Sequence, residues 1–219
     1  MLAHYGRHLK TVEINTSFYR SPDAGTIASW VGAVPPGFRF AVKAHRKITH
    51  NRRMPDLERS AIALTEMVNG FGDRLGPVLF QFPAVAPFDE GRIERIVAQL
   101  PPHWRLAFQF RHRSWHTPAV GEQLERLGAA LVHGDGEPEA GPLGRGSFIY
   151  LRMRRPAYSP QRLAVWERRI RLYLAEGRDV FVYFKHESAA PALAQRLRDR
   201  IRTSARENEY SRAIIRATR

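Results

Sequence analysis

The chain has 219 residues, of which 43% are hydrophobic and 26% are charged. This length and composition are typical of one folded domain and exclude a collagenous, coiled-coil or disordered chain. We find neither an apolar run long enough to span a membrane nor a signal peptide, so we expect a cytoplasmic protein with no membrane partner. The absence of cysteine excludes disulfides, thiolate metal sites and a cysteine nucleophile.

The charge is strongly positive, because 35 Lys and Arg residues stand against 21 Asp and Glu residues, a formal net charge of +14. Such a field attracts polyanions, so nucleic acid is the first partner that the charge suggests. Lysine occurs only at Lys10, Lys43, Lys47 and Lys185, and such an excess of arginine can also reflect a GC-rich genome. Charge alone leaves both explanations open.

Seven short apolar runs alternate with helical patterns along the chain, which is typical of a parallel sheet wrapped by helices. We predict strands at Thr11–Tyr19, Arg39–His45, Pro77–Pro83, Arg105–Arg111, Ala129–Asp135, Phe148–Arg154 and Asp179–Lys185. Ser21-Pro22, Thr117-Pro118 and Ser159-Pro160 open three predicted helices, the last ending at Gly177, and apolar spacing predicts two more at Glu58–Val68 and Ile93–Leu100.

Two stretches differ in composition from the rest. Residues 134–146 are rich in Gly and Pro and lack the spacing of a P-loop or of a dinucleotide fold, so we predict a loop and no cofactor. The C-terminal end is rich in arginine, which favours a solvated terminal helix over a nucleic-acid arm. We therefore predict a barrel domain at residues 1–202 and a basic tail at residues 203–219.

Alternate residues of each strand face the helices or the barrel axis, and here the axial set is polar near the strand ends. The positions near the strand ends are Asn15, Lys43, His45, Gln81, Gln109, Arg111, Arg152, Arg154, Lys185 and Glu187, and Glu13 and Tyr183 also face the axis. The active site of a TIM barrel lies at this end, and clustered cations there predict binding of phosphate, carboxylate or a nucleic-acid backbone. The alternative is that Arg111, Arg152 and Lys185 pair with Glu13 and Glu187 in ion networks that fill the barrel.

Several histidines also fall at or just past predicted strand ends: His45, His50, His112, His116, His133 and His186. Only Glu13, Asp135 and Glu187 could join them as metal ligands, so we predict no metal site. A histidine in this position more often acts in acid-base chemistry, forms a hydrogen bond or is structural. No GxSxG or HExxH motif supports a hydrolase or protease.

Five segments together resemble the YecE-like proteins, the family of domain of unknown function 72: TVEINTSFYRSP, PPGFRFAVKAHRKITH, GPVLFQFP, FRHRSW and VYFKHESAAPALA. The resemblance runs from about Ala3 to about Leu197. It implies an α/β TIM-barrel-like fold with seven of eight strands readable, and it implies no particular reaction. The positions that match the family's motifs are Glu13, Asn15, Phe18, Tyr19, Lys43, His50, Gln81, Arg111, His112, Trp115, Tyr183 and Lys185.

Three departures from the family's pattern matter. The family's GTSGW-like first strand has no counterpart here, so two sheet edges should lack partners, which favours dimerisation or poor solubility, although the oligomeric state stays open. Gln109 stands where the family usually has Glu, and Arg154 stands where it usually has His. These two replacements shift the site from acid-base chemistry towards anion binding.

We therefore predict that Glu13, His50 and His112 are the catalytic candidates. The predicted ligand-binding residues are Asn15, Tyr19, Lys43, Gln81, Gln109, Arg111, Trp115, Arg152, Tyr183 and Lys185. The leading hypothesis is a basic cleft that binds a phosphate-bearing small molecule or nucleic acid, with aromatic residues that stack on the ligand or belong to the core. The alternatives are an enzyme acting on a small phosphorylated or carboxylated metabolite, and a non-catalytic family member.

Overall fold

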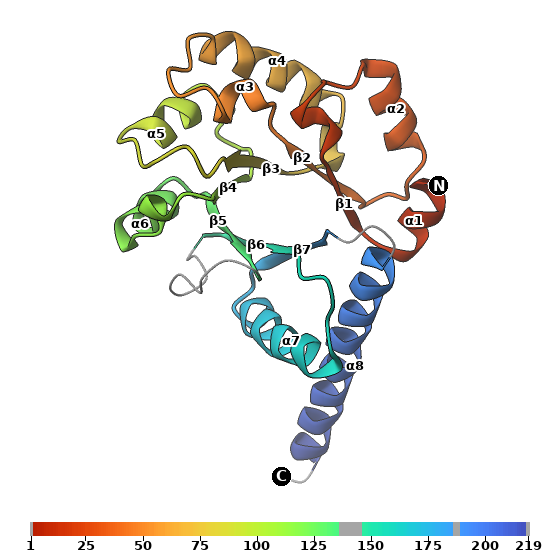
Figure 1. The fold of residues 1–219 in the computed structure, drawn as a ribbon. Helices are drawn as coiled ribbons and strands as arrows, with labels where there is room; N and C mark the ends of the chain where they lie inside the picture. Colours follow the sequence, from red (N-terminus) through yellow and green to blue (C-terminus); the bar gives the residue numbers. More distant parts are fainter. Residues whose placement is uncertain (1, 136–145, 186–188, 218–219) are drawn as a thin grey trace.

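The protein is a parallel β-barrel surrounded by helices, and its computed structural model describes residues 2–135, 146–185 and 189–217, with side chains up to residue 203. Within these ranges seven strands form one sheet in the order β1-β2-β3-β4-β5-β6-β7 (Figure 1). The predicted α/β TIM-barrel-like fold is therefore confirmed. Parts of the predicted loop at 134–146, together with His186 and Glu187, lie outside the described residues.

Every predicted strand is present, with ends that differ by a few residues. The strands are β1 Thr11–Ile14, β2 Arg39–Lys43, β3 Leu75–Phe82, β4 Leu106–Phe110, β5 Ala130–Gly134, β6 Phe148–Met153 and β7 Asp179–Phe184. The α-helices are α1 Leu2–His8, α2 Ala24–Gly32, α3 Arg46–Thr49, α4 Leu57–Asn69, α5 Arg92–Val97, α6 Pro118–Arg126, α7 Pro160–Ala175 and α8 Ala190–Ala217. The described residues also contain three short 3₁₀ helices, η1 Thr16–Phe18, η2 Gly72–Arg74 and η3 Arg113–Trp115.

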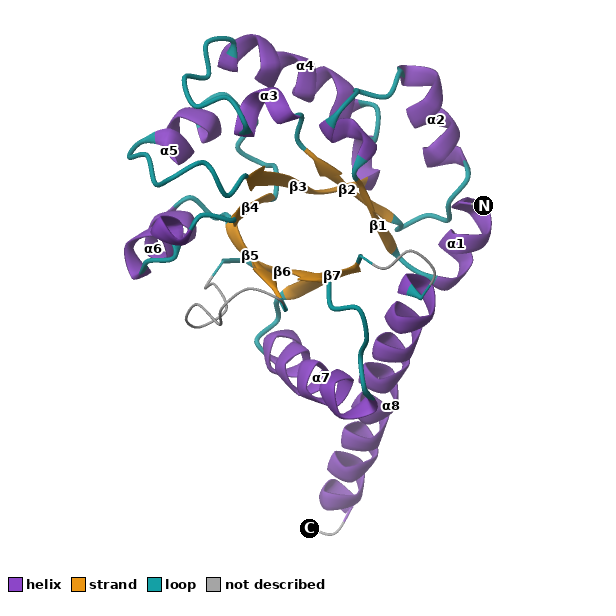
Figure 2. Ribbon diagram, in the orientation of Figure 1, coloured by secondary structure: helices purple, strands orange, loops and turns teal. Residues whose placement is uncertain are grey.

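The barrel is open between its first and last strands. Each strand pairs in parallel with the next, but no backbone ladder in the described residues joins β1 to β7. Figure 2 shows the strands as an inner ring with the helices outside it. A side-chain contact joins β1 to β7 across the opening, since Thr11 Oγ1 lies 2.8 Å from the Tyr183 hydroxyl. The two unpartnered edges expected from the sequence are thus present at this seam.

The first strand is shorter than predicted because its last residues turn into η1. Asn15 leaves the extended conformation, and the backbone N–H of Tyr19 bonds back to Thr16 O. Asp23, rather than Ser21, caps α2, accepting the N–H of Thr26 at 2.8 Å. At the far end of α7, Gly177 adopts φ +76°, a left-handed conformation that favours glycine and ends the helix as predicted.

The two faces of the strands separate into two kinds of core, as the alternation predicts. Phe40 and Val42 pack outward against the helices, in a cluster that extends through β3 and β4. Ala41 and Leu79 instead face the axis, where they pack with residues of β5, β6 and β7. The axis is therefore apolar over part of its length, and the polar residues collect beyond it.

The C-terminal helix α8 runs without interruption across the predicted boundary at residues 202 and 203. Its first turns lie on the barrel, because Leu193 and Leu197 are buried in a cluster with α7 and β6. Among the described residues, we find no helix that has both the length and the apolar character needed to cross a membrane.

Candidate functional site

A chain of buried hydrogen bonds crosses the carboxyl end of the barrel. Lys43 on β2 donates from Nζ to Gln81 Oε1 on β3 at 2.7 Å, and Gln81 Nε2 donates to Gln109 Oε1 on β4 at 2.7 Å. The same Gln109 oxygen accepts from Arg152 Nη1 on β6 at 2.8 Å. Gln81 and Gln109 occupy paired positions of neighbouring strands, so the register of the sheet places their amides side by side.

The chain continues to one carboxylate. Arg152 Nη2 donates to Glu13 Oε1 at 2.6 Å, and this pair is buried, with side chains 4% and 5% exposed. Asn15 Nδ2 donates to the same oxygen at 2.9 Å, while the Tyr150 hydroxyl donates to Glu13 Oε2 at 2.6 Å. The Glu13 carboxylate thus accepts hydrogen bonds from three side chains. Its pairing with Arg152 agrees with the alternative expectation of an ion network that fills the barrel.

Lys43 has no carboxylate partner among the described residues, although the whole residue is only 8% exposed. Its ammonium group lies 3.6 Å from the centre of the Phe18 ring. Burial, followed by the charges of Arg152, Arg111 and Arg154, lowers the pKa of Lys43, Glu13 opposes the change, and the net pKa is about 8. Cations of β6 and of the residues that follow β4 and β6 therefore act on this lysine.

The 3₁₀ helix η1 is what places Phe18 over Lys43. The buried Ser17 hydroxyl donates to the carbonyl oxygen of Lys43 at 2.7 Å, which fastens η1 to the end of β2. His45 accepts the N–H of Lys47 on Nδ1, so its Nε2 carries the proton and donates to Tyr19 O at 3.1 Å. These two bonds hold the segment from 17 to 19 against the end of β2.

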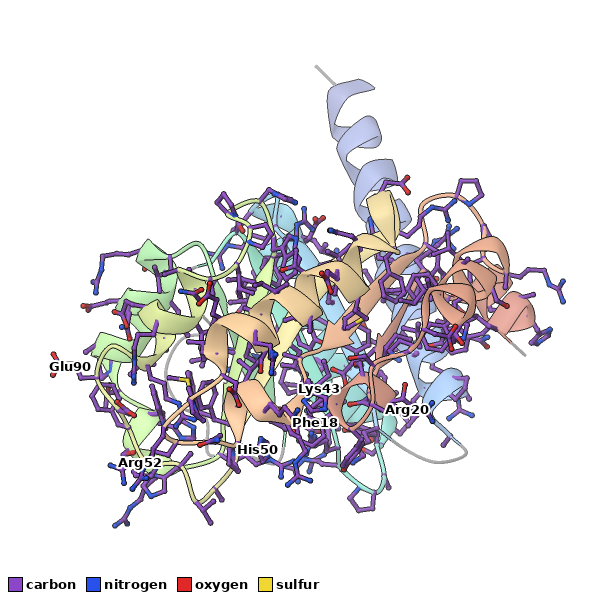
Figure 3. All side chains as sticks on the ribbon, turned by 90° about the horizontal axis from the view of Figure 1, so that it is seen from above. Phe18, Arg20, Lys43, His50, Arg52 and Glu90 are labelled. Atoms are coloured by element: carbon purple, nitrogen blue, oxygen red, sulfur yellow. The ribbon has the colours of Figure 1, made fainter. Side chains whose placement is uncertain are left out.

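His50 contacts the same aromatic ring. The rings of Phe18 and His50 are 4.9 Å apart, edge to face, and Figure 3 shows Phe18, Lys43 and His50 gathered at one end of the barrel. Partial burial, together with the charges of Lys43, Arg46, Arg111 and Arg92, lowers the pKa of His50 to about 4. The imidazole is therefore uncharged at neutral pH, even though the side chain reaches solvent.

A buried arginine fixes the backbone around His50. Arg92 is 1% exposed and donates from Nη2 to the carbonyl oxygens of Thr49 and Asn51, at 3.2 and 3.1 Å. Its guanidinium lies 4.8 Å from the centre of the Phe82 ring. The burial of Arg92 could not be predicted from the sequence, because an arginine at the start of a short helix carries no signal of burial.

A shallow hollow of about 460 Å³ opens beside this group. It is lined by Tyr19, His45, Arg46, Lys47, His50, Asn51 and Arg52. Tyr19 is 71% exposed, which leaves one face of an aromatic ring open to solvent next to three cationic side chains. Such a surface suits an anionic ligand that also carries a flat group.

The structure brings together most of the predicted residues but not all of them. Glu13, Asn15, Lys43, Gln81, Gln109 and Arg152 share the hydrogen-bonded chain, and Arg111 and Lys185 are exposed at the ends of β4 and β7. Tyr183 is 9% exposed and bonds to Thr11 at the seam. Tyr150, which alternation places on the axis, belongs to the network but was not among the predicted ligand residues.

Trp115 and His112 make structural contacts with residues near them in the fold. Trp115 is 1% exposed, stacks on Phe110 with ring centres 4.3 Å apart, and donates from Nε1 to Ala86 O at 2.9 Å. His112 accepts the N–H of Ser114 on Nδ1 and so caps η3. In the part of the chain that the structure describes, neither is hydrogen-bonded to a member of the chain of hydrogen bonds. In the described ranges, no three His, Asp or Glu side chains gather in a way that could hold a metal ion.

The open barrel of parallel strands, with helices between them, defines the class as a TIM-barrel-like α/β protein. A family model described as "Protein of unknown function DUF72" matches residues 1–214, and the chain belongs to that family. The resemblance to YecE-like proteins is thereby confirmed.

Relatives and solved structures agree with this assignment. The UPF0759 protein YunF of Bacillus subtilis (strain 168) is 30% identical over 139 residues, which are 56% of this chain and 46% of YunF. The chain thus matches about half the length of this curated relative. A DUF72 family protein (EF0366) from Enterococcus faecalis V583 has a TM-score of 0.79 at 20% identity, covering 94% of this chain and 93% of that one. Another (TM1631) from Thermotoga maritima MSB8 has a TM-score of 0.72 at 20% identity, covering 90% and 85%. At this identity the structures establish the fold alone.

Proposed function

We propose that the carboxyl end of the barrel binds a ligand that carries a phosphate group. The observation that carries this proposal is the charge balance around Lys43. Arg152 and Arg111 both act on its pKa as cations, and Glu13, the opposing carboxylate, is already bonded to Arg152, Asn15 and Tyr150. A buried or half-buried excess of positive charge is costly in the free protein, so an anion that neutralises it gains affinity there.

The direct test is calorimetric titration with glycerol 3-phosphate, with glycerol as the uncharged comparison. Arg111→Gln removes an exposed cation at the end of β4 without touching the buried network, and Arg126→Gln removes an exposed cation at the end of α6. We expect glycerol 3-phosphate to bind, glycerol not to bind, and Arg111→Gln to lower the affinity about tenfold, as the loss of one charged hydrogen bond does. Equal affinities for Arg111→Gln and Arg126→Gln would contradict the proposal.

Nucleic acid is the second candidate, and the hollow beside Tyr19 favours it. Arg46, Lys47 and Arg52 could neutralise backbone phosphates there while a base stacks on Tyr19. Nucleic-acid binding depends steeply on salt because counterions are released, whereas a small metabolite held in the barrel mouth shows a weaker dependence. A salt titration with labelled single-stranded and duplex DNA distinguishes the two ligands. The cytoplasmic location stays a prediction from the sequence.

A further inference from the structure

Lys43 differs from the other lysines of the chain in its surroundings. Lys10, Lys47 and Lys185 are exposed, whereas Lys43 is 8% exposed. A buried lysine usually pairs with a carboxylate, since an isolated ammonium group loses its hydration on burial. Lys43 instead has one amide oxygen, of Gln81, and the face of the Phe18 ring. Its surroundings stabilise the charged form poorly.

The charged groups that face Lys43 come from several elements, and most of them disfavour its charge. Arg152 on β6 is the strongest of the cations, Arg111 and Arg154 follow β4 and β6, and Glu13 on β1 opposes them. With a pKa of about 8, roughly a tenth of Lys43 is uncharged amine at pH 7. An uncharged amine has a free electron pair and is a nucleophile towards carbonyl carbon.

We propose that Lys43 forms an imine with a small aldehyde or ketone whose phosphate or carboxylate group is held by the cations of the barrel mouth. The proposal rests on the proposed anion site and adds the carbonyl group to the description of its ligand. Arginines near a lysine that has no carboxylate partner among the described residues provide the two features that such a ligand needs, an anchor for the anion and a nucleophile within the same group of side chains.

The step balances without any further reactant. The electron pair of Nζ forms a bond to the carbonyl carbon, the π electrons of the C=O bond move to oxygen, and that oxygen takes a proton from Nζ to give a carbinolamine. Loss of the hydroxyl group with the second proton of Nζ then releases one water molecule and leaves the C=N bond. When the imine nitrogen takes up a proton from solvent, its N–H can donate to Gln81 Oε1 as the ammonium group does now. Nothing is oxidised or reduced.

The test traps the imine by reduction with sodium cyanoborohydride and locates the product by peptide mass mapping. Three probes separate the two parts of the ligand: glyceraldehyde 3-phosphate has both groups, glyceraldehyde has only the carbonyl, and glycerol 3-phosphate has only the phosphate. We expect glyceraldehyde 3-phosphate to label Lys43 about tenfold faster than Lys10, Lys47 or Lys185, and labelling of Lys43 to increase with pH around a midpoint of about 8. The exposed lysines are controls within the same chain, so this comparison needs no variant.

The outcomes distinguish this inference from the anion site on which it rests. If glycerol 3-phosphate binds but glyceraldehyde 3-phosphate labels the four lysines at similar rates, the imine proposal is overturned and the anion site stands. If glyceraldehyde labels Lys43 as fast as glyceraldehyde 3-phosphate does, and glycerol 3-phosphate does not slow this labelling, Lys43 is a nucleophile but the anion-site proposal fails. Lys43→Arg keeps the charge and should lose the adduct, while Lys47→Arg, at an exposed position, should keep it.

Discussion

Arg152 and Glu13 form an ion pair across the interior of the barrel, with Nη2 and Oε1 2.6 Å apart. Their strands, β6 and β1, are not neighbours in the sheet, and β1 and β7 are not joined by a ladder. The pair therefore links the first strand to the sixth across the interior, while the contact between Thr11 and Tyr183 links the two end strands. This gives it a structural role as well as a place in the candidate site.

We predict that Glu13→Gln destabilises the fold by about 3 kcal/mol, because it leaves the Arg152 guanidinium buried without its carboxylate. Urea unfolding measures the loss. Glu90→Gln, at an exposed position, is the control and should change stability by less than about 0.5 kcal/mol. Equal stabilities of the two variants would show that the pair contributes nothing at the seam.

The pKa of Lys43 predicts a pH dependence of stability with a definite sign. Its folded pKa of about 8 lies below its ordinary value of 10.5, so between these values the unfolded chain binds more protons and stability increases with pH. Relative to Lys43→Met, the parent should gain on the order of 2 kcal/mol between pH 7 and pH 10.

Unfolding by urea at several pH values checks this, with Lys47→Met as the control for loss of an exposed cation. The window ends near pH 10, since the raised pKa values of Tyr150 and Tyr183 bring a change of the opposite sign at higher pH. A constant difference between parent and Lys43→Met across this range would mean that Lys43 is not perturbed by its surroundings.

The sequence predicts the fold well because its signals are local and periodic. The period of two in β2 separates Phe40 and Val42 from Ala41 and Lys43, and the structure places these sets on opposite faces. A strand has only two faces, so one correct assignment fixes all its residues. The end of β1 was less predictable, because the turn at Asn15 depends on Ser17 reaching the carbonyl of Lys43, a contact between distant segments.

The candidate site could be predicted only in part, for a related physical reason. Alternation identifies Glu13, Gln109 and Arg152 as axial, but it does not tell which of them bond to one another. Trp115 illustrates the opposite difficulty, since an aromatic residue just past a strand can face the ligand or the helices, and only the packing on Phe110 decides.

Because Trp115 is buried, a substitution there can distinguish a structural role from a role in ligand binding. Trp115→Phe loses the hydrogen bond to Ala86 O and part of the ring packing, so stability should fall by about 1–3 kcal/mol. Affinity for glycerol 3-phosphate should not change. Calorimetry on the folded variant checks both statements, and a weakened affinity without loss of stability would place Trp115 in the ligand site instead.

Arg92 is predicted to act by positioning the backbone around His50. Arg92→Lys cannot reproduce the two bonds from one planar guanidinium group to Thr49 O and Asn51 O. We expect amide hydrogen exchange at residues 49–51 to become at least severalfold faster, as expected for a segment that has lost its buried anchors. Arg95→Lys, whose side chain is 52% exposed, is the matched control on the same helix and should leave exchange unchanged.

Tyr19 decides between the two classes of ligand, because it is 71% exposed and contributes little to the core. If a base stacks on its ring, Tyr19→Ala should weaken binding of single-stranded DNA by about 1–3 kcal/mol while leaving the melting temperature and the salt dependence nearly unchanged. Tyr19→Phe keeps the ring and should bind like the parent. If Tyr19→Ala and Tyr19→Phe bind DNA equally well, the hollow holds only phosphates. If neither the variants nor the parent bind DNA, but glycerol 3-phosphate still binds, the ligand is a small anion held at the ends of the strands.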